Sequence, residues 1–192
     1  MSVVVVNHVT LDGVMQAPGR PDEDTRGGFA RGGWATAESD PALGAAMREA
    51  MGEGHAWLFG RRTYDDLLGH WNAVGGPFAT GLNSVMKYVA TADESRELPW
   101  PNTVRLSGDV PKEVRALRET LDGNLVIMGS GVLVRALLAH DLVDRILLII
   151  HPVTVGGGKR MFADDGALRR FTLEQCGRTA AGLLMARYGK NA

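Results

Sequence analysis

The chain has 192 residues, of which 45% are hydrophobic and 22% are charged, a composition typical of a globular protein with a sizeable core. Its formal net charge of -1 argues against a general nucleic-acid binder, and no apolar stretch is long enough to span a membrane. Cys176 is the only cysteine, which excludes an internal disulfide, and we expect no signal peptide and a cytoplasmic location.

The N-terminal part of the chain predicts a strand, a long loop and a helix. Residues 3–6 are four valines, as in a strand buried on both faces. Residues 12–34 are rich in glycine and proline, and so long a loop in a compact domain is more often functional than idle. Asp40, followed by a proline, predicts the N-cap of a helix that ends at Gly52 or Gly54.

The rest of the chain alternates between strand and helix patterns. Apolar runs predict strands at 56–59, 87–90, 103–106, 125–128 and 145–150. Helical spacing predicts helices at 63–68, at 111–121, and from the glycines at 129–131 to residue 139. The segment 171–188, with a turn at 179–182, predicts a hairpin. This alternation indicates an α/β fold with a largely parallel sheet and an antiparallel edge, in one domain over residues 1–192.

Two of the predicted strands end in a glycine that is followed by a polar loop and a helix. The first reads FGRRT at 59–63 and the second reads MGSGVL at 128–133. Free N–H groups at a helix start favour an anion, and an arginine there can bind phosphate oxygens with two hydrogen bonds. Together the two turns suggest a dinucleotide. Taken singly, each is equally well an ordinary turn, and paired arginines are often solvated surface charge.

Other catalytic patterns are incomplete. The glycine-rich segment at 129–134 lacks the third glycine of the dinucleotide fingerprint, and GGGK at 156–159 lacks the Ser or Thr that a P-loop requires next. Ser130 lies outside a nucleophile-elbow pattern, which argues against a serine hydrolase. The five histidines show no metal-ligand spacing, so we expect no metal site, and each is interpreted singly as structural.

The order of these segments resembles the dihydrofolate reductase-like family. More closely, it resembles the branch named for the C-terminal reductase domain of the riboflavin-biosynthesis deaminase-reductase. The resemblance covers nearly the whole chain. It depends on the strand 3–8, LDG at 11–13, GRRTY at 60–64, MGSG at 128–131, and HPV at 151–153 followed by GGG at 156–158 and MF at 161–162.

The resemblance implies a dihydrofolate reductase-like α/β fold, with a twisted, mostly parallel sheet of about eight strands, flanking helices and a C-terminal antiparallel hairpin. It also implies NADPH as the hydride donor. The residues implied at the 2'-phosphate, adenosine and pyrophosphate are Gly60, Arg61, Arg62, Thr63, Thr91, Gly129, Ser130, Gly131, Val132 and Leu133. Those implied near the nicotinamide are Asn7, His8, Met15 and Gln16, the first two through backbone atoms.

A proton donor is harder to assign. In dihydrofolate reductases a carboxylate early in the helix before the second strand binds the pterin, and here that region offers Glu38 and Asp40. Asp40 is also explained as a helix cap, and a third candidate, Asp12, as a turn cap. Folate reduction is therefore not favoured, and a bound water is an alternative donor.

We expect an NADPH-dependent oxidoreductase that transfers a hydride to a small heterocyclic, carbonyl or imine substrate, with the loop 12–34 as a lid. One alternative is the riboflavin-pathway 5-amino-6-(5-phosphoribosylamino)uracil reductase, for which the loop supplies only Arg20, Arg26 and Arg31 as cations. Another is a non-catalytic NADPH-binding module. The apolar C-terminal hairpin and the resemblance favour a homodimer.

Overall fold

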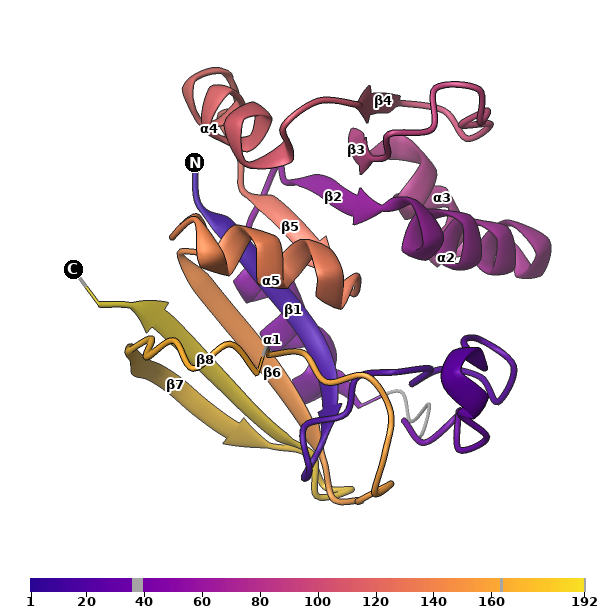
Figure 1. Cartoon of the computed structure of the whole chain (residues 1–192). Helices are drawn as coiled ribbons and strands as arrows, with labels where there is room; N and C mark the ends of the chain where they lie inside the picture. Colours follow the sequence, from indigo (N-terminus) through magenta and orange to yellow (C-terminus); the bar gives the residue numbers. More distant parts are fainter. Residues whose placement is uncertain (36–39, 163, 192) are drawn as a thin grey trace.

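The computed structural model describes residues 1–35, 40–162 and 164–191. They contain one eight-stranded sheet in the order β4-β3-β2-β5-β1-β6-β8-β7 (Figure 1). The strands are β1 (Val3–Thr10), β2 (Ala56–Gly60), β3 (Lys87–Ala90), β4 (Thr103–Leu106), β5 (Leu125–Met128), β6 (Arg145–His151), β7 (Phe171–Arg178) and β8 (Leu184–Lys190). The helices are α1 (Pro41–Met51), α2 (Arg61–Val74), α3 (Pro77–Ser84), α4 (Val110–Thr120) and α5 (Gly131–Ala139), with a short 3-10 turn at Arg26–Gly28.

The sheet is parallel from β4 to β6, and among the described strands β8 alone runs in the opposite direction. β1 lies between β5 and β6 and is parallel to both. β8 pairs antiparallel with β6, and β7 pairs antiparallel with β8 at the sheet edge. The expected fold, a mostly parallel α/β sheet of eight strands with a terminal hairpin, is confirmed.

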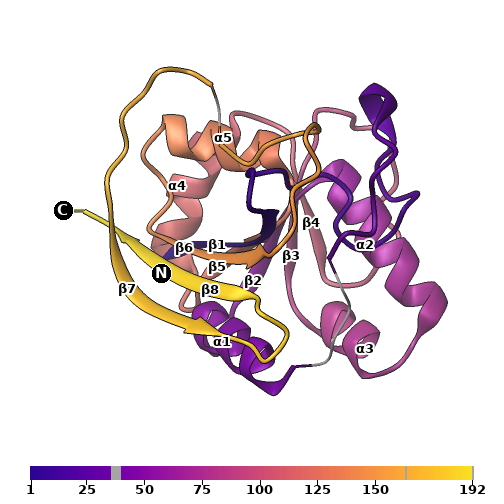
Figure 2. The same ribbon diagram turned by 90° about the horizontal axis from the view of Figure 1, so that it is seen from below.

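Both faces of the sheet are covered by helices, which explains why its central strands are continuously apolar. Val3 and Val5 of β1 belong to the core under α4 and α5, whereas Val4 and Val6 belong to the core under α1, α2 and α3. All four valines are at most 1% exposed. Seen along the sheet, α4 and α5 lie on one side and α1 on the other (Figure 2). β1 also continues past the predicted valines, because Asn7 to Thr10 pair along β6.

The helix α2 is longer than predicted. It runs over Arg61–Val74 instead of 63–68, because Leu68 and Trp71 continue the apolar side begun by Tyr64 and pack into the core. Gly69 does not stop the helix. The helix ends at Val74, and its C-cap is Gly75, whose positive φ of 77° suits glycine.

The helix α3 was not predicted at all. Its C-terminal end is held by Lys87 of β3, which is fully buried. The Lys87 ammonium donates to the carbonyl oxygens of Leu82 at 2.7 Å and Val85 at 2.6 Å, so it supplies donors that the helix end lacks. Lys87, a charged residue at the start of the predicted strand 87–90, thus binds the end of a neighbouring helix.

The connections that leave the neighbouring strands β2 and β5 lead in opposite directions. The chain passes from β2 through α2 and α3 to β3 on one side, and from β5 through α5 to β6 on the other. In open α/β sheets such a reversal leaves a crevice outside the carboxyl ends of the strands, which is the usual ligand-binding position. β1, β2 and β5 all end at this edge.

Candidate functional site

The two glycine turns of the sequence are in contact. β2 and β5 are neighbouring parallel strands, so Gly60 at the end of one meets the turn that follows the other. A Cβ atom on Gly60 would clash with the Ser130 hydroxyl and approach the Ser130 Cβ to 3.0 Å. A Cβ on Gly129 would lie 3.1 Å from a methyl group of Thr63. The two predicted turns therefore pack directly against each other at the starts of α2 and α5.

Asn7 holds the second turn to the central strand. It is 4% exposed, and its side-chain oxygen accepts from the Gly129 N–H at 3.1 Å. Its amide nitrogen lies 3.7 Å from the Met15 sulfur, and a Cβ on Gly131 would be 2.7 Å from that sulfur. Asn7 and Met15 thus lie beside the glycine turn. Ser130 adopts a left-handed conformation with φ 58° between them and α5.

The two residues that follow this turn differ from each other. The Val132 side chain is 69% exposed, whereas that of Leu133 is 6% exposed and packs in the core under α5. Leu133 can therefore contribute to the turn only through its backbone.

The two adjacent arginines have different surroundings. Arg61 donates to the Asp65 carboxylate at 2.6 Å, and the same oxygen accepts from Arg96 at 3.2 Å. Arg62 is exposed, and within the described residues it has no ion pair. Arg61 therefore belongs to a cationic group between α2 and the loop after β3.

That loop begins at Thr91, which continues the β3–β4 ladder through its N–H to the Leu106 carbonyl at 3.0 Å. Its hydroxyl accepts from the Asp93 N–H at 3.2 Å. The Ser95 hydroxyl chiefly, then backbone N–H groups and the charge of Arg61, hold the pKa of Asp93 below its usual value. The loop that begins at Thr91 thus comes close enough to Arg61 for the guanidinium charge to act on Asp93.

The candidate carboxylates make structural hydrogen bonds. Asp12 accepts from the Thr10 hydroxyl at 2.6 Å and from the Gly156 N–H at 2.9 Å, and the Thr10 bond first of all lowers the pKa of Asp12. Asp40 caps α1 by accepting from the Ala42 N–H at 2.8 Å, and its other oxygen accepts from the Ala180 N–H at 3.3 Å. Glu38 lies outside the described residues. A catalytic role for these carboxylates stays a prediction.

The loop after β1 is fastened to the segment that contains GGGK. The Gln16 side chain is 4% exposed, accepts from the Lys159 N–H at 2.9 Å and donates to the Arg26 carbonyl at 2.9 Å. The Trp34 indole N–H donates to the Gln16 carbonyl at 2.8 Å. Gln16 was expected near the nicotinamide, but both ends of its side-chain amide are used to hold the loop.

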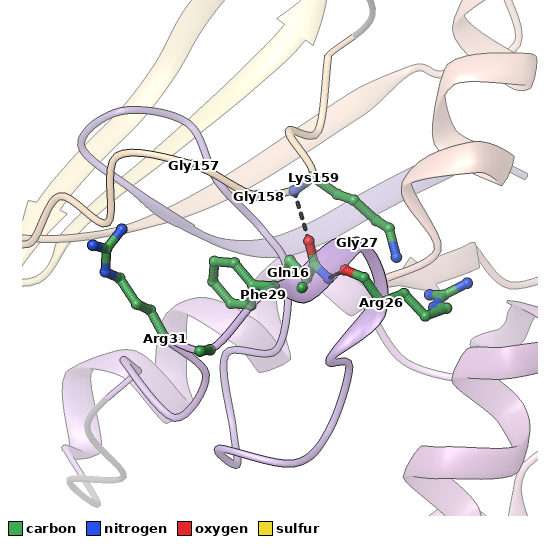
Figure 3. Close-up of a pocket in the computed structure, with 10 residues that line it drawn as sticks. Gln16, Arg26, Gly27, Phe29, Arg31, Gly157, Gly158 and Lys159 are labelled. Atoms are coloured by element: carbon green, nitrogen blue, oxygen red, sulfur yellow. Dashed lines mark hydrogen bonds between the residues drawn. The ribbon is translucent and has the colours of Figure 1, made fainter.

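A cavity of about 520 Å³ lies between this loop and the glycines at 157–158. Figure 3 shows Arg31 at one end and Arg26 with Lys159 at the other, with Phe29 and Gln16 between them. Asp24 pairs with Arg26 at 2.5 Å and with Lys159 at 2.9 Å. Burial raises the pKa of Asp24, but these hydrogen bonds more than offset it and leave the pKa well below its usual value. The three cations Arg26, Arg31 and Lys159 outnumber the one carboxylate, Asp24, so the net charge around the cavity is positive.

The structure also brings together two histidines: His8, which the resemblance implies near the nicotinamide, and His151, which taken singly is interpreted as structural. The His8 Nδ1 atom lies 2.8 Å from the His151 Nε2 atom, and the edge of Trp34 packs on the His151 ring at a centroid distance of 5.3 Å. Burial, and then the neighbouring His151, lowers the pKa of His8 to about 4. Burial also lowers the pKa of His151. The residues are 143 positions apart, so no local spacing indicates the pair.

The described residues contain no group of three or more His, Cys, Asp or Glu side chains that could hold a metal ion. Within the same residues, no helix has both the length and the apolar character needed to cross a membrane.

Solved structures share the fold of this chain at low sequence identity. A putative riboflavin biosynthesis protein from Shewanella sp. PV-4 is 19% identical with a TM-score of 0.66, and the match covers 100% of both chains. Dihydrofolate reductase from Enterococcus faecalis, solved with NADP(H) and RAB-propyl, is 14% identical with a TM-score of 0.65, covering 100% of this chain and 97% of that one. These likenesses show the fold.

A third similar structure is longer than this chain. It is a diaminohydroxyphosphoribosylaminopyrimidine deaminase/5-amino-6-(5-phosphoribosylamino)uracil reductase from Thermotoga maritima, 16% identical with a TM-score of 0.66. The match covers 99% of this chain and 56% of that one. No curated protein matches the chain in sequence. The family model described as the RibD C-terminal domain matches residues 1–185, and the chain therefore belongs to the RibD C-terminal domain family.

Proposed function

We propose that the protein is an NADPH-dependent reductase of a small heterocyclic, imine or carbonyl compound. The observation that carries the proposal is the contact between the two glycine turns at the carboxyl ends of β2 and β5. Helix starts at such a crevice attract phosphate, and a Cβ atom at Gly60 or Gly129 would press against a side chain of the other turn. The donor set of this crevice fits a dinucleotide phosphate.

Different groups of residues in the chain would bind the different parts of the cofactor. Gly60 and Thr63 on one side and residues 129–133 on the other would hold the pyrophosphate through backbone N–H groups. Arg61, with Arg96 and Thr91 beside it, would bind the 2'-phosphate, since a guanidinium can bind phosphate with two hydrogen bonds. Asn7 in β1 and Met15 in the loop after β1 lie beside the second glycine turn, and would border the nicotinamide.

The chemistry expected of the bound cofactor is delivery of a hydride from the nicotinamide to the acceptor. The protein would orient the two molecules and keep water away, with the loop 12–34 as the cover. That loop is fastened by Gln16, Trp34 and Asp12, so several hydrogen bonds hold it in its position beside β1.

Titration of the protein with NADPH and NADH, followed by nicotinamide fluorescence, tests the cofactor proposal. We expect NADPH to bind more tightly than NADH, and failure of both to bind would refute it. NADPH oxidation is then measured with dihydrofolate, pyrroline and phenanthrenequinone, which represent a heterocycle, an imine and a dicarbonyl. Binding of NADPH without reduction of any acceptor would instead support the non-catalytic NADPH-binding module.

The cationic cavity supports a second candidate function, the reduction of 5-amino-6-(5-phosphoribosylamino)uracil, an activity printed in the name of the Thermotoga maritima protein. A substrate of this type carries a phosphate, and Arg26, Arg31 and Lys159 surround a space large enough for a sugar phosphate (Figure 3). Protection by ribose 5-phosphate tests it. We expect this sugar phosphate, but not ribose, to raise the melting temperature, and the effect to disappear in Arg31→Ala.

A further inference from the structure

The central strand β1 carries different side chains on its two faces at the sheet edge where the second glycine turn lies. Asn7 accepts from the Gly129 N–H on one face. His8 follows directly, and because successive strand residues point to opposite faces, its imidazole lies on the other face. That is the face of α1, where His151 stands at the end of the neighbouring strand β6. His8 thus follows the anchor of the glycine turn by one residue in sequence and lies on the opposite face of the sheet.

The pair is enclosed by the loop that we expect to act as a lid. His151 is 2% exposed, and Trp34 covers its ring edge-on. Trp34 is itself held by its hydrogen bond to the Gln16 carbonyl. The His151 imidazole therefore lies beneath this loop with little access to bulk water, and the neighbouring His8 is half-buried.

The short contact between the rings defines how they can share protons. At 2.8 Å one imidazole N–H donates to the unprotonated nitrogen of the other. The pair can accept one further proton, but a second would place two positive charges in contact. Burial lowers the pKa of both rings, so a proton on the pair is given up readily.

Other charged groups on the surrounding elements are engaged elsewhere. Asp12, after β1, accepts from Thr10 and Gly156, and Asp40, before α1, accepts from two backbone N–H groups. Arg31, on the loop, donates to the Val155 carbonyl at 2.6 Å. Within the described residues none of these three groups has a hydrogen bond to either ring. None of these three groups therefore fixes a proton on the imidazole pair, which is free to exchange it.

We propose that the His8–His151 pair supplies the proton that accompanies hydride transfer, which rests on the proposed reductase function. The hydride carries two electrons to the carbon of a C=N or C=O bond, and the π electrons of that bond move to its nitrogen or oxygen. This atom takes a proton from the singly protonated pair. The cofactor leaves oxidised, and the pair returns to its neutral form and regains a proton from water.

The test compares His8→Ala and His151→Ala with the matched control His140→Ala, an exposed histidine at the end of α5. Fluorescence titration first establishes that each variant still binds NADPH. Turnover of the acceptor that the wild type reduces fastest among dihydrofolate, pyrroline and phenanthrenequinone is then measured across pH, with and without added imidazole. His8→Gln and His151→Gln replace either alanine variant that fails to bind NADPH.

We expect kcat of both variants to fall by about 100-fold, the wild-type decrease of kcat with rising pH to disappear, and imidazole to restore part of the rate. The control keeps the wild-type profile. A variant that binds NADPH and keeps the pH profile, or is slow at every pH without rescue by imidazole, would refute the proton-source role alone. Failure of the wild type to reduce any acceptor would instead refute the reductase function on which the role rests.

Discussion

Arg61 and Arg62 are identical residues in adjacent positions, yet we expect them to affect cofactor choice differently. Arg61 shares the Asp65 carboxylate with Arg96 and influences Asp93, whereas the side chain of Arg62 extends into solvent. A charge-assisted hydrogen bond to a phosphate contributes about 1.5–3 kcal/mol, which corresponds to roughly 10- to 100-fold in affinity.

Arg61→Ala should therefore raise the Kd for NADPH by roughly 10-fold or more and leave the Kd for NADH nearly unchanged. Arg62→Ala is the matched control and should have a smaller effect on NADPH. Isothermal titration with both cofactors measures the four affinities. Equal losses for NADPH and NADH in Arg61→Ala would show that this arginine does not bind the 2'-phosphate.

His8 makes a second prediction at the residue scale, on stability. Its pKa in the folded protein is about 4, below the ordinary value of 6.5, so the unfolded chain binds more protons between these two pH values. The free energy of unfolding should therefore decrease as the pH falls through this window, by about 1.4 kcal/mol for each pH unit when His8 acts alone. Urea unfolding at about pH 7.5 and about pH 5 measures the difference.

The variant His8→Gln should lose part of this pH dependence, and the remainder reflects His151 and other groups. His140→Gln, on an exposed position, should keep the wild-type dependence. If His8→Gln and the wild type lost the same stability on acidification, the low pKa assigned to His8 would be wrong.

At the scale of the elements, Gly60 and Ser130 should behave as one unit. Gly60→Ala introduces a Cβ against the Ser130 hydroxyl and should reduce both the melting temperature and the affinity for NADPH. Ser130→Gly removes that hydroxyl and relaxes a left-handed backbone with φ 58°, so it should rescue part of the loss in the double variant. A double-mutant cycle on both measurements gives the coupling, and additive effects would contradict it.

Gly81→Ala provides the control for this cycle. A Cβ at Gly81 in α3 meets nothing within 4 Å, so alanine should stabilise that helix by about 0.5–1 kcal/mol. A decrease in stability there would show that glycine-to-alanine changes are harmful in this fold irrespective of contact.

The strands and several helices were predictable because local residues determine them. The apolar runs at 56–59 and 125–128 are buried on both faces, and Asp40 caps α1 with the expected hydrogen bond. The helix α3 was missed because its stability depends on Lys87, a residue outside the helix that binds its carbonyl groups. Local patterns cannot show such a tertiary contact.

The same distinction applies to the site. The glycine turns were recognisable because each follows its own strand, but their mutual contact depends on β2 lying beside β5. The His8–His151 pair depends on the register of β1 against β6, which sets His8 opposite Ile149. Strand register is fixed by the whole core, so two histidines that look isolated in sequence become neighbours only in the folded sheet.

At the scale of the molecule, the sheet has two edge strands, β4 and β7, and we expect two chains to form a homodimer through β7. β7 is exposed along nearly its whole length, and Leu173 is 51% exposed while Leu184 of β8 is 41% exposed. An exposed edge strand offers unpaired backbone groups to a second chain, and an apolar surface beside it favours burial. The other edge, β4, is half the length of β7.

Sedimentation velocity should therefore show a dimer for the wild type and a monomer for Leu173→Lys, because a lysine at the interface would be buried without a partner. Val104→Lys is the matched control, since Val104 is 44% exposed on the β4 edge. A dimer that persists in Leu173→Lys and dissociates in Val104→Lys would place the interface at the opposite edge. A monomeric wild type would refute the homodimer, and unchanged NADPH binding in both variants would show that the cofactor crevice is complete within one chain.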